Sequence, residues 1–157
     1  MPMQLDGACR CGAVRFTVAS HTPYPYQLCY CSICRKTAGG GGYAINLGAV
    51  AATLSVRGST AIYHAEIDGE RSNAERHFCP HCATALWLFD DRWPELIHPF
   101  ASAIDTTLPR PPARVHIMLA SKPSWVEPAI GPNDARFDAY PDESIADWHR
   151  ARGLWIG

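Results

Sequence analysis

Seven cysteines form three tight groups whose spacing is typical of metal ligands. The groups are Cys9-X-Cys11, Cys29-X-Cys31-X-X-Cys34 and Cys79-X-X-Cys82. Thiolate sulfurs on one tetrahedral zinc lie about 3.8 Å apart, because each Zn–S bond is roughly 2.3 Å long, and turns of this spacing deliver that separation. Seven cysteines divide naturally as four plus three. Four cysteines make a closed structural site, whereas three leave one position on the metal for water or a substrate.

Disulfides, a redox pair and histidine ligands are the alternatives to sites made of cysteine alone. The two residues of a Cys-X-Cys step make a poor disulfide pair, and seven thiols would leave one unpaired. A redox pair at Cys31-X-X-Cys34 would normally open a helix in a βαβ unit, and the chain shows no such alternation. His77 and His81 flank Cys79, and imidazole suits zinc. With seven cysteines present, we expect both histidines to lie outside the coordination sphere.

Composition excludes several classes of protein. The chain has 157 residues, of which 47% are hydrophobic, and we expect one domain over residues 1–157. A net charge of −1 without any Lys/Arg run argues against nucleic-acid binding. The first residues lack a signal-peptide pattern, and no stretch approaches the roughly 20 apolar residues that span a bilayer. Together with cysteines that suit a reducing compartment, this predicts a cytoplasmic protein without a membrane partner. The oligomeric state is left open.

The elements that must position the cysteines are mostly short strands. Alternation of apolar and polar residues, with Gly, Pro, Asn, Asp or Ser at the ends, predicts strands at 13–19, 43–47, 53–57, 61–66, 75–78, 85–89 and 114–119. The pattern indicates a mainly β domain built of hairpins. One helical turn is predicted at 32–38, and the proline-rich segment 105–113 is a loop. A last helix is expected over 143–152, with Asp142 as its cap and Gly153 as its stop.

Three motifs resemble one known family. The residues Gly7-Ala-Cys9-Arg-Cys11-Gly12, Cys29-Tyr-Cys31-Ser-Ile-Cys34-Arg35-Lys36 and Arg76-His-Phe-Cys79-Pro-His-Cys82 are similar to the glutathione-dependent formaldehyde-activating enzyme family, which includes relatives of centromere protein V. The resemblance continues through 116–125 and 137–141, so it covers about residues 7–141. Residues 142–157 are then a C-terminal helical extension. The resemblance implies a mainly β zinc-binding fold, Mss4-like or β-tent, with short helical segments.

The resemblance also implies how the cysteines divide, which spacing alone leaves open. It assigns a structural zinc to Cys9, Cys11, Cys79 and Cys82, and a second, open zinc to Cys29, Cys31 and Cys34, so two zinc ions per chain are expected. Two departures concern neighbouring residues rather than ligands. Ala83 stands where the family usually has a left-handed glycine, and Tyr30 stands where it usually has histidine.

The function that the resemblance implies is thiol chemistry on an aldehyde. It predicts a carbon–sulfur lyase or adduct-forming enzyme that acts on a glutathione–aldehyde conjugate such as S-hydroxymethylglutathione, or on a related small thiol conjugate. No catalytic residue is assigned beyond the three ligands of the open zinc. Arg35 and Lys36 directly follow Cys34 and could bind a carboxylate of the substrate, although a solvated pair is the alternative. The other interpretation is a zinc-stabilised binding module of the same fold without catalytic activity.

Overall fold

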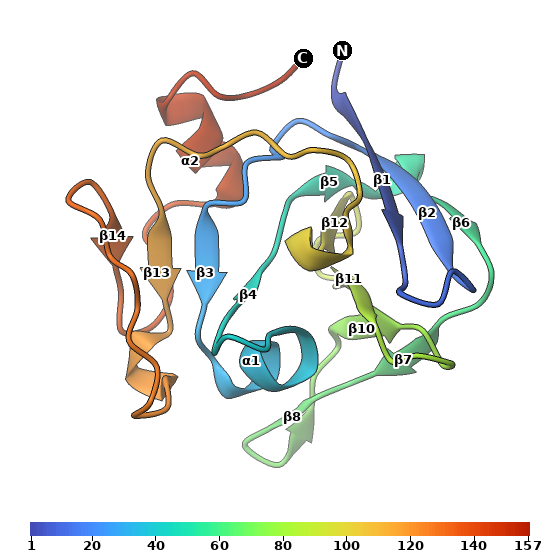
Figure 1. Ribbon diagram of the computed structural model, residues 1–157, viewed down its shortest axis with the longest axis horizontal. Coiled ribbons are helices and arrows are strands. Elements are labelled where there is room, and N and C mark those ends of the chain that lie inside the picture. The colour runs from blue at the N-terminus through green and yellow to red at the C-terminus, as the bar shows by residue number, and fades with distance from the viewer.

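Short strands make up most of the regular structure in the computed structural model, which describes residues 1–157 (Figure 1). The strands are β1 Met3–Ala8, β2 Arg15–Ser20, β3 Gln27–Cys29, β4 Ala44–Ile45, β5 Ala49–Val50, β6 Ser55–Arg57, β7 Ala61–Tyr63, β8 Glu66–Ile67, β9 Glu70–Arg71, β10 Glu75–Phe78, β11 Ala85–Phe89, β12 Leu96–Pro99, β13 Val115–Ile117 and β14 Ala135–Arg136. The α-helices are α1 Ser32–Ala38 and α2 Ile145–Ala151, and 3-10 turns occur at Ala51–Thr53, Ala101–Ala103 and Leu119–Ser121. The prediction of a mainly β fold with short helical segments is confirmed.

The strands form four sheets that leave both cysteine sites at strand ends. Their orders are β1-β2-β6, β5-β12-β11-β10-β7, β14-β13-β3-β4 and β8-β9.

Strands β10 and β11 coincide with the predicted ranges 75–78 and 85–89. Six strands lie outside the predicted ranges: β1, β3, β5, β9, β12 and β14. They are short or lie next to cysteines and prolines, so alternation of apolar residues is hard to see there.

The prediction that the domain consists of hairpins is wrong for one sheet. Strand β13 pairs in parallel with β3 and with β14, while the pairs β1–β2 and β10–β11 are antiparallel as expected. Parallel neighbours need a crossover connection, and here the partners β3 and β13 are far apart in sequence. Each strand has only two or three residues, so its own sequence carries no information about the partner.

The helices lie where the sequence predicted them, with a different cap on the second. Helix α1 has the predicted bounds, and Cys31 caps it, because its Sγ accepts a hydrogen bond from the Cys34 N–H at 3.2 Å. Helix α2 begins two residues later than expected. Ser144, rather than Asp142, is its cap and accepts from the Asp147 N–H at 3.0 Å. Gly153 has a positive φ of 66° just after this helix. At seven residues each, neither helix could cross a membrane.

Two hydrophobic clusters hold the cysteine sites separately. The larger contains Phe16 and Trp87 and includes the buried Cys9 and Cys79. The second contains Tyr26, Phe100 and Trp148 and includes the buried Cys29 and Cys34. Tyr26 stacks on Trp148 of α2 with 3.7 Å between ring centroids. Each cysteine site is therefore anchored in a packed interior, and α2 is anchored against the second one.

Candidate metal centres and the adjoining cavity

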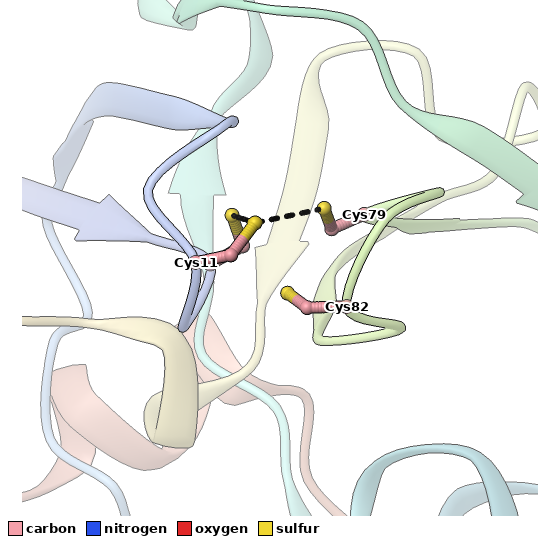
Figure 2. Close-up of side chains that lie close together, drawn as sticks. Cys11, Cys79 and Cys82 are labelled. Atoms are coloured by element: carbon pink, nitrogen blue, oxygen red, sulfur yellow. Dashed lines mark hydrogen bonds between the residues drawn. The ribbon is translucent and has the colours of Figure 1, made fainter.

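The first cysteine site is formed by two hairpin turns that meet. The turn after β1 carries Cys9 and Cys11, and the turn between β10 and β11 carries Cys79 and Cys82. The four sulfurs all lie within 4.8 Å of one another, and Figure 2 shows the Cys11, Cys79 and Cys82 side chains converging. The Sγ of Cys11 is 3.6 Å from that of Cys9 and 3.8 Å from that of Cys79. These separations match tetrahedral thiolate coordination.

Backbone and hydroxyl donors surround the sulfurs of this first site. The N–H of Val14 donates to Cys9 Sγ at 3.2 Å, and the N–H of His81 donates to Cys79 Sγ at 3.4 Å. Thr84 joins the two turns, because its Oγ1 lies 3.2 Å from Cys82 Sγ and accepts from the Arg10 N–H at 3.1 Å. Hydrogen bonding to Thr84 lowers the pKa of Cys82 to about 5. These donors favour thiolates, the form in which cysteine binds metal.

Ala83 adopts the left-handed conformation for which glycine is the usual residue. Its φ is 64°, and its N–H donates to the Cys79 carbonyl at 2.8 Å, closing the turn that carries Cys79 and Cys82. Left-handed backbone costs a residue with a Cβ roughly 1–2 kcal/mol. Ala83 therefore keeps the left-handed conformation expected of the usual glycine, at this cost in free energy.

Neither histidine beside Cys79 belongs to the group of converging sulfurs. The ring of His77 is bonded on both sides, with Nδ1 2.7 Å from Thr60 Oγ1 and Nε2 3.0 Å from Glu75 Oε1. It also stacks on Trp87 at a centroid distance of 4.9 Å. His81 is exposed, and its backbone rather than its ring contacts a sulfur. Both lie outside the candidate coordination sphere, as the sequence predicted.

The second site consists of three cysteines at the junction of β3 and α1. The sulfurs of Cys29, Cys31 and Cys34 lie within 4.8 Å of one another, and no fourth Cys, His, Asp or Glu belongs to the group. Cys29 and Cys34 are buried, whereas Cys31 is half-buried. Hydrogen bonds from the Cys29 and Cys34 thiols hold the pKa of Cys31 far below its usual range, while the same contacts raise the pKa of Cys29. The three sulfurs are close enough together to bind one metal ion.

Arg76 is the cation that contacts this second site. Its Nη2 lies 3.8 Å from Cys34 Sγ, and its Nη1 donates to Thr37 Oγ1 at 3.4 Å. Arg76 also lines a cavity of about 310 Å³. The other polar lining residues are Thr37, Tyr63 and His77, and Phe78 and Phe100 are among the apolar ones. Sequence reasoning did not select Arg76 as a site residue. Its position three residues before Cys79 gives no sign that it reaches a sulfur in the other site.

Arg35 and Lys36 do not line this cavity. Arg35 is half-buried and its Nε has no hydrogen-bond partner, while Lys36 is exposed on α1. Their proposed contact with a substrate carboxylate stays a prediction. The guanidinium that the structure brings to a cysteine is that of Arg76.

Tyr30 begins a buried chain of hydrogen bonds behind the second site. Its Oη lies 2.9 Å from Nδ1 of His116, and Nε2 of His116 lies 3.1 Å from Oδ2 of Asp134. The carboxylate of Asp134 also accepts from the Arg114 and Gly131 N–H groups, each at 2.9 Å. Because a carboxylate accepts, Nε2 of His116 is the donor, and in the neutral ring Nδ1 accepts from the Tyr30 hydroxyl. Burial raises the pKa of Tyr30 to about 12, which keeps the phenol protonated as this donor.

The hydrogen-bond chain ties the cysteine turn to two distant segments. Tyr30 is 1% exposed and His116 is fully buried, so neither group has water as an alternative partner. His116 lies on β13, and Asp134 directly precedes β14. The tyrosine that replaces the usual histidine therefore ties the segment between Cys29 and Cys31 to β13 and to the start of β14.

Both groups of cysteines have a donor set that fits zinc. Soft thiolates select zinc or copper(I) over hard cations, and four sulfurs within 4.8 Å make a complete tetrahedral set. The three-sulfur group offers the set expected of a metal with one open position. Each group could hold a metal ion.

The fold and the two cysteine sites define a mainly β protein with two candidate metal centres. The chain belongs to the glutathione-dependent formaldehyde-activating enzyme family, whose model matches residues 4–120. A Halomonas elongata protein, named provisionally as a glutathione-dependent formaldehyde-activating enzyme, is 66% identical over 157 residues, which are 99% of this chain and 100% of that protein. A crystal structure of a Rhodobacter sphaeroides protein matches with a TM-score of 0.53 and 26% identity, covering 68% of this chain and 92% of that one. The family resemblance seen in the motifs is confirmed.

Proposed function

We propose that this protein is a zinc-dependent enzyme that forms or cleaves the carbon–sulfur bond of a glutathione–aldehyde adduct such as S-hydroxymethylglutathione. Family membership and the name of the Halomonas elongata relative support glutathione and formaldehyde as the reactants. The observation that carries the proposal is the three-sulfur group, which lacks a fourth ligand and whose Cys34 contacts Arg76, a residue that also lines a cavity. A purely structural zinc site normally has four protein ligands, so a three-cysteine group favours a reactive metal.

The two proposed zinc ions have different roles. Cys9, Cys11, Cys79 and Cys82 would hold a closed zinc that joins two hairpins distant in sequence and so stabilises the fold. Cys29, Cys31 and Cys34 would hold the second zinc. When bound there, zinc supplies either deprotonation of a thiol or polarisation of an aldehyde oxygen.

The residues around the cavity would orient the substrate. The Arg76 guanidinium offers planar N–H donors that match a carboxylate, and glutathione has two carboxylates. Thr37 accepts from the Arg76 side chain and so restricts its position. Phe78, Ala85 and Phe100 provide apolar walls that exclude water from the reacting groups.

The proposed reaction needs no oxidant or reductant. In the forming direction, the glutathione sulfur adds to the aldehyde carbon, so one carbon–sulfur bond forms and the carbonyl π bond breaks. The thiol proton ends on the former carbonyl oxygen, which becomes a hydroxyl group. Cleavage is the reverse of these steps. Because the adduct also forms spontaneously, the enzyme has to supply only a modest acceleration.

Exchange kinetics test this function against the alternative of a binding module. The rate of interconversion between ¹³C-formaldehyde and its glutathione adduct is measured by NMR exchange spectroscopy with and without protein. We expect the zinc-loaded protein to increase the rate above the spontaneous one, and Cys34→Ser to remove the increase while far-UV circular dichroism stays unchanged. A wild-type protein that binds two zinc ions but leaves the rate unchanged would reject the enzyme and favour the binding module.

A further inference from the structure

A second cavity, of about 440 Å³, lies between the C-terminal segment and an edge of the five-stranded sheet. Val50 of β5 and Leu96 and His98 of β12 line it from the sheet, and Ile145 of α2 and Trp155 line it from the other side. Ile97, between Leu96 and His98, points into the hydrophobic core instead. Protein interiors contain few voids larger than one water molecule, whereas ligand pockets measure about 300–1,000 Å³. The size of this cavity is that of a ligand pocket.

Specific contacts hold the C-terminal wall in place. The Ile156 N–H donates to the His21 carbonyl at 3.0 Å, and the ring of His21 stacks on Trp155 with 4.7 Å between centroids. Gly48 lets the backbone before β5 lie close to Thr22 and to Ile145 of α2. A Cβ at this position would collide with Thr22 and press on Ile145. The family model ends at residue 120, so α2 and Trp155 lie beyond it. The C-terminal segment therefore forms one wall of this cavity, which shares no lining residue with the cavity that Arg76 lines.

Two imidazoles give the cavity its polar character. Nδ1 of His98 lies 3.0 Å from the Leu47 carbonyl, and Nδ1 of His21 lies 2.6 Å from the Ile156 carbonyl. Since a carbonyl oxygen only accepts, both Nδ1 atoms are donors, and in the neutral ring each Nε2 keeps a lone pair. Burial lowers the pKa of His98, so this ring is neutral at pH 7. Neither Nε2 has a partner in the protein, so both are free to accept a hydrogen bond.

The other residues that line the cavity disfavour a charged ligand. No Asp, Glu, Lys or Arg lines the cavity, and a charged ligand would lose its hydration without gaining an ionic partner. Glutathione and other carboxylates are therefore excluded here. Trp93, Leu96 and Ile145 offer apolar surface that suits an aromatic ring. The faces of Trp155 are covered by the His21 ring and the Arg150 guanidinium, so this indole closes the wall of the cavity.

We propose that this cavity is a second ligand site, which binds an uncharged aromatic molecule that donates a hydrogen bond to His98 or His21. The proposal does not depend on the zinc chemistry at the cysteine sites. It rests on the volume of the cavity, the absence of charged lining residues and the two accepting imidazoles.

Two probes of nearly equal shape test the proposal on the unmodified protein. 2-Naphthol has a hydroxyl donor, and 2-methoxynaphthalene has none. Each is titrated into protein labelled with ¹⁵N-tryptophan while the five indole N–H signals are followed. We expect the Trp93 and Trp155 signals to shift to saturation, and 2-naphthol to bind about tenfold more tightly, as one additional hydrogen bond implies. Trp125, which lines a different cavity, serves as the internal control and should not shift.

Variants then locate the binding. Ala146→Phe fills the cavity from α2 and should abolish the shifts of Trp155 and Trp93. His98→Phe removes one acceptor and should reduce the preference for 2-naphthol. Absence of saturable shifts at Trp93 and Trp155 in the unmodified protein would overturn the site. Equal affinity for the two probes would overturn recognition through a hydrogen-bond donor, and neither result depends on whether a variant folds.

Discussion

The guanidinium of Arg76 touches the sulfur of Cys34, with 3.8 Å between Nη2 and Sγ. Arg76 lies on β10, the strand that leads into the four-cysteine site, whereas Cys34 belongs to the three-cysteine site on α1. The same side chain lines the 310 Å³ cavity. One residue therefore connects the two candidate metal centres with the proposed substrate cavity.

Arg76→Ala should impair substrate binding without removing metal. Loss of a charge-assisted hydrogen bond to a carboxylate typically costs about 1.5–3 kcal/mol, so we expect KM for the glutathione adduct to rise at least about tenfold. Steady-state kinetics measure this rise, and elemental analysis should still find two zinc ions per chain. Arg57→Ala, at an exposed position on β6, is the matched control and should leave KM unchanged. An unaltered KM in Arg76→Ala would remove Arg76 from the substrate site.

Cys79→Ser should prevent stable folding. Cys79 is fully buried in the larger hydrophobic cluster, and its sulfur helps to complete the four-sulfur group. Removal of one ligand weakens a metal site whose binding free energy is also folding free energy. We expect insoluble protein, or a thermal unfolding midpoint far below that of the wild type, whereas Cys34→Ser should stay folded. A Cys79→Ser variant with an unchanged midpoint would contradict the structural role of the first site.

Tyr30→Phe should destabilise the fold through His116. Without the phenol, Nδ1 of His116 has no donor in an interior that water does not reach, which costs about 1–3 kcal/mol in the free energy of unfolding. Tyr43→Phe is the matched control, because Tyr43 packs beside Tyr30 at a centroid distance of 5.5 Å. No hydrogen bond of its hydroxyl is present, so its loss should change stability by less than about 0.5 kcal/mol. Urea unfolding of both variants measures the difference, and equal stabilities would argue against the hydrogen-bond chain.

Ala83→Gly should stabilise the protein, against the usual effect of adding glycine. Ala83 has a φ of 64°, and glycine adopts that conformation without the Cβ penalty. After the greater entropy of glycine in the unfolded chain is subtracted, a gain of about 0.5–1 kcal/mol remains. Ala85→Gly, two residues later in β11, should have the opposite sign. Thermal unfolding compares the two, and destabilisation by both would show that the left-handed turn is not strained.

The sequence predicted the features that repeat at short range. Hairpin strands such as β10 and β11 and the helix α1 follow from local alternation and from the residues at their ends. The parallel pairing of β3 with β13 could not be predicted from local sequence, since it depends on contacts between segments far apart in the chain. The cap of α2 was predicted at Asp142, because Asp and Ser are both good N-caps and the pattern alone does not choose between Asp142 and Ser144.

In the candidate site too, residues that act through contacts between distant segments could not be predicted from the sequence. Cysteine spacing gave the count of four plus three, and the family motifs gave the pairing of distant turns that the structure brings together. Arg76, Thr84 and the chain from Tyr30 to Asp134 were not recognised as parts of the sites. These residues act through contacts across the fold. Their residue types are common, so only their positions in the folded protein distinguish them from ordinary polar residues.

Glutathione titration of the cobalt-substituted protein tests the central proposal most directly. Visible and thiolate-to-metal absorption bands are followed while metal ions per chain are counted. The account predicts two cobalt ions per chain and a change in the bands of one of them on addition of glutathione, because only the three-cysteine site has an open position. A single metal ion that does not respond to thiol, or two that both ignore glutathione, would contradict it.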